Sequence, residues 1–223
     1  MTSVGQVRRT LIWVAIFGVA FAFVESAVVV YLRALYYPEG FVLPLKGLLA
    51  QHLTVEVARE TATIAMLCAV AMMAGRKAWE RFGYFMVAFG VWDIFYYVWL
   101  KVLLGWPASA FDWDVLFLIP VPWIGPVVAP LLVALAMVGC GVAICLRIAG
   151  GRPFQPRLLA WALGVAGTAV LLFSFLSDTD ATLHGLPPQE YRYGLLAGGL
   201  LLLLSGFGLA WRSQAKGRDG LES

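Results

Sequence analysis

Ionisable residues inside long apolar segments are the feature that most constrains this chain. Six segments are apolar enough and long enough to cross a hydrocarbon core as helices: 10–32, 55–75, 82–104, 126–146, 158–177 and 193–211. Hydrophobic residues make up 61% of the sequence, well above the share in soluble domains. We therefore predict an all-α polytopic membrane protein with six transmembrane helices. A single domain would cover residues 1–212, followed by a short polar cytoplasmic tail at 213–223.

Basic residues gather in alternate connecting segments, which predicts the topology. The segments before the first helix and after the second, fourth and sixth hold 11 of the 16 basic residues but three of the 13 acidic ones. Since positively charged segments stay in the cytoplasm, both termini should be cytoplasmic. The first apolar segment continues past the only plausible cleavage point, near Ser26, so we expect an uncleaved helix. The expected location is a bacterial-type plasma (inner) membrane.

Three polar stripes fall in the predicted outer half of the first three helices. Residues three, four or eight positions apart lie on the same face of a helix, so the side chains of one stripe should point to the same side of their helix. The stripes are Glu25 with Arg33; Glu56 with Arg59 and Glu60; and Asp93 with Tyr96, Tyr97 and Lys101. Charges within a membrane span are costly and usually face partners or a wet cavity. We expect one ligand-binding cavity lined by these residues and open toward the outer side.

Structural roles compete with this interpretation for several of the residues. Glu56 lies near a helix start, where the helix dipole favours it, and Arg59 can pair with it at the interface. Arg33 and Lys101 can extend to the headgroups. Glu25 and Asp93 have neither a cap nor an interface to explain them, so we expect an inward-facing pair, with Arg59 and Lys101 as the available cations.

The segment from Pro107 to Pro130 is too rich in proline for regular helix. Residues 115–125 are also too apolar for water, so we predict an extended or re-entrant segment over the outer mouth of the bundle. Trp106, Trp113 and Trp123 should anchor it at the interface. Trp123 should lie beside the stripes of Asp93 and Glu60, with Asp114 at the rim and the fourth helix starting near Pro126. The alternative is one long, kinked fourth helix.

The two halves of the chain differ. The acidic intramembrane residues lie in the first three helices, and no internal repeat of the kind common in secondary transporters is visible. The sixth helix has small residues suited to close packing within the molecule: Gly194, Gly198, Gly199, Ser205 and Gly208.

The residue inventory gives no reason to expect a cofactor or a metal. His52 and His184 lie in predicted outer loops, and a haem held by two histidines inside the bundle is therefore excluded. Cys140 and Cys145 are five residues apart and do not share a helix face. Acid–base chemistry by a carboxyl pair with Tyr96 or Tyr97 remains open.

Three classes of function fit these observations. The leading hypothesis is a lipid-handling enzyme or carrier whose outer cavity binds an amphiphilic or small polar ligand, because aromatic and carboxylate groups together suit a cationic or zwitterionic headgroup. The alternatives are a proton- or ion-coupled transporter and an accessory subunit of a larger membrane complex. Expected partners are membrane lipids, the ligand and possible membrane subunits. A net charge of +3 gives no reason to expect nucleic acid.

Overall fold

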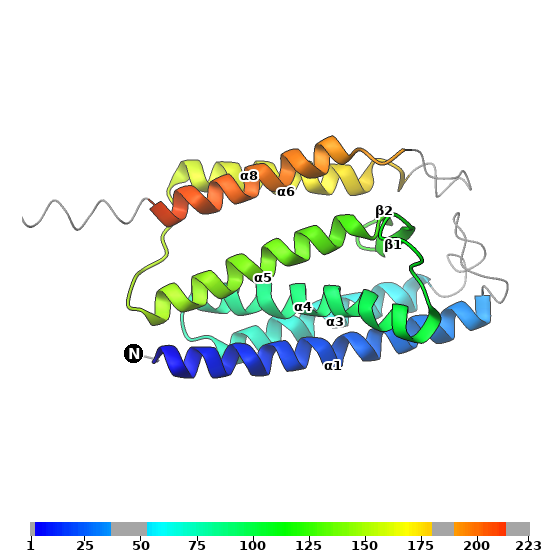
Figure 1. Ribbon diagram of the computed structural model, residues 1–223, viewed down its shortest axis with the longest axis horizontal. Coiled ribbons are helices and arrows are strands. Elements are labelled where there is room, and N and C mark those ends of the chain that lie inside the picture. The colour runs from blue at the N-terminus through cyan, green and yellow to red at the C-terminus, as the bar shows by residue number, and fades with distance from the viewer. Residues whose placement is uncertain (1–2, 37–52, 180–189, 213–223) are drawn as a thin grey trace, which may run out of the picture.

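The computed structural model describes residues 3–36, 53–179 and 190–212, and these residues form a bundle of long helices (Figure 1). Six helices are long and apolar enough to span a membrane, which confirms the all-α polytopic prediction. They are α1 (Val4–Tyr36), α3 (Leu53–Ala74), α4 (Ala78–Leu104), α5 (Val128–Ala149), α6 (Leu158–Leu176) and α8 (Tyr193–Arg212). The predicted tail at 213–223 and the loop histidines His52 and His184 lie outside the described residues.

The two ends of the bundle differ in what they carry. Helix α1 begins and α8 ends at one end, here called the terminal end (Figure 1). Two short strands lie at the opposite end, here called the hairpin end. The chain order therefore agrees with an even number of crossings. The cytoplasmic assignment of the terminal end stays a prediction from its basic residues.

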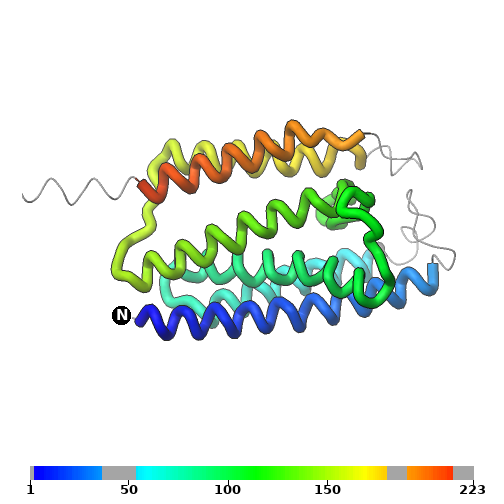
Figure 2. Tube along the Cα trace, in the orientation of Figure 1, coloured from blue at the N-terminus to red at the C-terminus, as the bar shows by residue number. Residues whose placement is uncertain are grey.

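Helix α4 is central to a four-helix group. It packs against α1, α3 and α5, whereas α6 and α8 pack chiefly against each other as a separate pair (Figure 2). Val7, Leu67 and Tyr84 are almost fully buried in the core shared by α1, α3 and α4. Helix α4 starts at Ala78, four residues before the sequence prediction. The carboxylate of Glu80 accepts the backbone N–H of Arg76 at 2.8 Å and so holds the entry to its first turn.

Small residues bring α6 and α8 into close contact. A Cβ atom added to Gly167 would lie 2.8 Å from the backbone oxygen of Gly199, and one added to Gly206 would lie 2.9 Å from that of Ala160. The prediction of close packing within the molecule is thus confirmed for Gly199. It is wrong for the predicted glycines whose added Cβ atoms would meet nothing within 4 Å, namely Gly194, Gly198 and Gly208.

The proline-rich segment forms an antiparallel hairpin of β1 (Trp113–Phe117) and β2 (Trp123–Pro126). Asp114 pairs with Gly125 and Val115 with Ile124, and Ile124 is fully buried. The extended conformation is therefore confirmed, and the kinked-helix alternative is wrong. The fourth membrane helix begins at Val128, which confirms the predicted start near Pro126, and the N–H of Val128 donates to the oxygen of Ala110 at 2.7 Å.

Candidate functional site: a polar cavity at the hairpin end

A cavity of about 110 Å³ lies between α1, α3, α4 and the hairpin. Its polar lining includes five carboxyl groups, from Glu25, Glu56, Glu60, Asp93 and Asp114, and two guanidinium groups, from Arg33 and Arg59. Aromatic side chains of α4 complete the wall: Trp92, Tyr96 and Tyr97. Carboxyl groups therefore outnumber the cations that face them.

Arg59 joins the carboxylates of two helices on one side of the cavity. It forms an ion pair with Glu25 of α1 and contacts Oε2 of Glu56, one turn away in α3, at 2.9 and 3.0 Å. The Thr63 hydroxyl donates to Oε1 of Glu25 at 2.6 Å. Glu25 is thus held between two side chains of α3, and its negative charge is matched by a cation within the membrane-spanning part of the protein.

The hairpin closes the cavity through two further contacts. The backbone N–H of Leu118, just after β1, donates to Oε2 of Glu60 at 2.8 Å. On the opposite side, Oδ1 of Asp114 lies 3.5 Å from Nη2 of Arg33, and the Arg33 guanidinium lies 3.8 Å above the ring of Trp106. These contacts join the hairpin to α3 and α1 through charged groups, so the hairpin forms part of the cavity wall.

Burial changes the ionisation of the hairpin carboxyl. Asp114 is 3% exposed, and burial raises its pKa to about 6, while the positive charge of Arg33 acts in the opposite direction. The Tyr97 side chain approaches this carboxyl, but Oδ2 makes no hydrogen bond of regular geometry with the described residues. Asp114 therefore has acceptor capacity left over after pairing with Arg33.

Two other cavity groups are left without protein partners among the described residues. The half-buried Asp93 carboxyl makes neither a hydrogen bond nor an ion pair with them. The indole N–H of Trp92, whose side chain is 7% exposed, donates to none of them. Buried polar groups are normally paired, so the Trp92 indole is an exception, and the Asp93 carboxyl lines the same cavity.

The structure brings together nine of the eleven residues singled out in the sequence. They are Glu25, Arg33, Glu56, Arg59, Glu60, Asp93, Tyr96, Tyr97 and Asp114. The first eight lie on the sides of α1, α3 and α4 that face this cavity. Asp114 was expected at the rim, but it is buried in the wall, where its carboxyl pairs with Arg33 of α1 and faces Tyr97 of α4.

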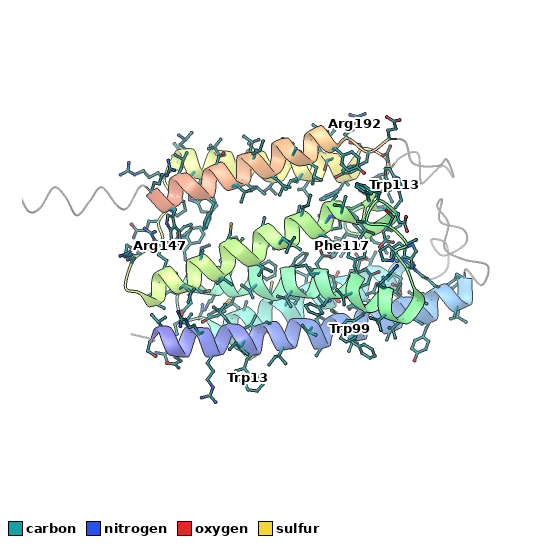
Figure 3. All side chains as sticks on the ribbon, viewed as in Figure 1. Trp13, Trp99, Trp113, Phe117, Arg147 and Arg192 are labelled. Atoms are coloured by element: carbon teal, nitrogen blue, oxygen red, sulfur yellow. The ribbon has the colours of Figure 1, made fainter. Side chains whose placement is uncertain are left out.

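Lys101 and Trp123 do not line the cavity. Lys101 is exposed and donates to the carbonyl oxygens of Gly105 and Pro107, at 3.1 and 2.7 Å. Its amine therefore binds the turn that directly follows α4 and does not reach the cavity. Trp123 stacks on Phe175 of α6, with ring centroids 6.1 Å apart, and also contacts Phe117 of the hairpin, which Figure 3 labels.

The sequence interpretation did not include two donors of the cavity wall, the Trp92 indole and the Leu118 amide. Trp92 precedes Tyr96 by four residues and so shares its face. The Leu118 amide is a backbone donor, and its place in the site cannot be predicted from the pattern of side chains in the sequence. Its pairing with Glu60 follows only from how the hairpin folds onto α3.

No group of three or more histidine, cysteine, aspartate and glutamate residues in the described part of the chain is arranged to hold a metal ion. Comparisons with family models, with curated proteins and with solved structures find no match to this chain. The integral membrane character therefore rests on the six apolar helices, and the function has to be argued from the cavity itself.

Proposed function

We propose that the hairpin-end cavity binds the polar, positively charged part of an amphiphilic or small polar ligand, as a lipid-handling enzyme or carrier would. The observation that carries this proposal is the excess of carboxyl groups. Arg59 matches Glu25 and Glu56, and Arg33 matches Asp114, whereas Glu60 and Asp93 have no ion pair within the described residues. A carboxylate buried without a cation is costly, and a ligand cation would relieve that cost.

The aromatic wall supports the same choice of ligand. Trp92, Tyr96 and Tyr97 lie on α4 around Asp93, with the rings of Tyr96 and Tyr97 5.0 Å apart. Ammonium groups are attracted to the faces of such rings and pair with a carboxylate at the same time. Asp93 would supply the charge, and the aromatic side chains would surround the non-polar faces of the cation.

The size of the cavity limits what can enter. About 110 Å³ is well below the roughly 300–1,000 Å³ of pockets that enclose a drug-sized molecule. A headgroup fragment or a small solute is of the right size, and the chain of an amphiphile would have to remain outside. The binding of an amine-bearing headgroup therefore fits the cavity better than the enclosure of a whole lipid.

Thermal stabilisation by a matched pair of probes tests the proposal. An alkylammonium amphiphile should raise the melting temperature of the purified protein more than the alcohol of the same chain length. Asp93→Asn should abolish this difference, while Asp112→Asn, outside the cavity on the same side of the bundle, should retain it. Equal stabilisation by the ammonium and the alcohol, or an unchanged difference in Asp93→Asn, would show the proposal to be wrong.

A proton-coupled transporter is the second candidate, and the unpaired state of Glu60 and Asp93 favours it. A buried carboxyl without a cation can instead be neutralised by a proton, as in proton relays. In liposomes containing the protein, a ligand gradient should then drive proton movement, which Glu60→Gln and Asp93→Asn should remove. If partner chains purify with the protein in fixed ratio and neither binding nor proton movement is found, the accessory-subunit hypothesis is favoured.

A further inference from the structure

A second cavity lies in the half of the bundle that the polar site does not use. It has a volume of about 490 Å³ and separates the α6–α8 pair from α4 and α5. Its lining consists of non-polar side chains except for Cys140 and Thr168, and the Thr168 hydroxyl is already bonded to the oxygen of Gly164 at 2.9 Å. Water would find almost no partners there, so the space suits hydrocarbon.

The cavity exists because the α6–α8 pair is attached to the rest of the molecule near its two ends. At the hairpin end, Trp123 stacks on Phe175, and the Thr179 hydroxyl donates to the oxygen of Pro122 at 2.5 Å. At the terminal end, the guanidinium of Arg147 lies 4.4 Å above the ring of Trp211. Arg147 lies in the last turn of α5, and Figure 3 labels it at that end of the bundle. The cavity lies between these attachments and is lined by side chains of α4, α5, α6 and α8.

The length of the cavity corresponds to one leaflet. Its lining on α5 runs from Val133 to Ile144, which is about 16 Å of helix at 1.5 Å per residue. Half of a hydrocarbon core is about 15 Å thick. An acyl chain from one leaflet would therefore fill the cavity along its length.

A basic pocket continues from the terminal end of this cavity. Its lining includes Arg76, Lys77 and Arg152, and it shares Trp79 and Phe154 with the apolar cavity. The rings of these two shared residues are 4.9 Å apart and form the boundary between the apolar and the basic part.

The charges of the basic pocket are available to a ligand. Arg76, Lys77 and Arg152 are exposed, and none of them pairs with a carboxylate among the described residues. The one acid in the lining, Glu80, accepts the backbone N–H groups of Arg76 and Lys77 at 2.8 and 3.4 Å. Basic pockets at the end of membrane helices bind anionic lipid headgroups.

We propose that an anionic phospholipid binds at the terminal end, with an acyl chain in the apolar cavity and its phosphate beside Arg76, Lys77 and Arg152. The continuity of the two pockets favours this occupant over a second copy of the chain, because a protein helix is too wide for a space of this volume. This site is separate from the hairpin-end cavity and does not depend on the function proposed for it.

Native mass spectrometry of the full chain in detergent, supplied with phosphatidylglycerol and phosphatidylcholine of identical acyl chains, tests the proposal. We expect phosphatidylglycerol to bind at least about tenfold more tightly, since each basic group near an anionic lipid contributes about fivefold. The triple variant Arg76→Gln, Lys77→Gln, Arg152→Gln should lose this preference. Arg8→Gln with Arg9→Gln, which removes basic residues of α1 outside the pocket, should keep it.

A second pair of variants tests the acyl-chain part. Ala169→Phe places a ring in the apolar cavity and should lower the bound phospholipid several-fold, whereas Ala166→Phe, on the same helix but outside the cavity lining, should not. Equal binding of the two lipids, retained preference in the triple variant, or equal lipid binding by the two phenylalanine variants would overturn the proposal. A dimer that excludes lipid from this face would also overturn it.

Discussion

The two cavities of this bundle are held open by different forces. The hairpin-end cavity has walls joined by ion pairs and hydrogen bonds, from Arg59 to Glu25 and from Leu118 to Glu60. The cavity beside α6 and α8 is lined by non-polar side chains and bounded by ring contacts. Directional contacts fix the position of each wall, whereas a non-polar gap can close or fill with hydrocarbon at little cost. The first region suits selective recognition of charge, and the second suits a lipid chain.

The largest expected effect comes from breaking the ion pairs of the polar cavity. Arg59→Gln removes the cation that matches Glu25 and Glu56, and we expect it to lower the free energy of unfolding by about 3 kcal/mol. This is the low end for a buried pair, because the Arg59 side chain is 24% exposed. Unfolding by sodium dodecyl sulfate in mixed micelles measures the change.

Lys101→Gln is the matched control for this prediction. It also removes a positive charge from the hairpin end, but Lys101 is exposed and, within the described residues, bonds to the carbonyl oxygens of the turn after α4. We expect a change of at most about 0.5 kcal/mol. Similar losses in Arg59→Gln and Lys101→Gln would mean that the ion pairs do not hold the cavity walls.

An intermediate change in the free energy of unfolding is expected at the contact between α6 and α8, which depends on close packing and not on ion pairs. Gly167→Ala puts a methyl group 2.8 Å from the backbone oxygen of Gly199 and should cost about 1–3 kcal/mol. Gly198→Ala meets no atom within 4 Å and should be neutral or stabilising, since alanine favours helix. The same unfolding assay compares them, and a loss of stability in Gly198→Ala equal to that in Gly167→Ala would contradict the packing argument.

The smallest expected effect is the pH response of the hairpin. The folded pKa of Asp114, about 6, is above its unfolded value, so the folded state binds more protons between these values. Stability from Asp114 should therefore increase by about 1 kcal/mol as the pH falls from 7 to 5. Unfolding measured at both pH values should show this increment as the difference between the wild type and Asp114→Asn, and Lys101→Gln should respond like the wild type. The idea fails if Asp114→Asn also responds like the wild type.

Much of the fold could be predicted because it depends on local properties of the sequence. The length of each apolar segment specified a membrane helix, and the spacing of Glu56, Arg59 and Glu60 showed which face they share. The prolines between Pro107 and Pro130 excluded regular helix. These inferences do not require the positions of neighbouring elements, because they follow from segment length, helical spacing and the geometry of proline.

Which residues of other elements contact each polar helix face depends on the tertiary structure. Spacing placed Lys101 on the face of Asp93 and Tyr97, but the turn after Leu104 offers carbonyl oxygens that its amine reaches instead. The burial of Asp114 depends on the fold of the hairpin, and Trp123 packs on Phe175, which lies 52 residues later in the chain. The sequence by itself thus determined six membrane helices and three polar stripes. Tertiary packing decided which stripes meet and which groups stay unpartnered, because contacts between distant segments depend on the relative positions of whole elements.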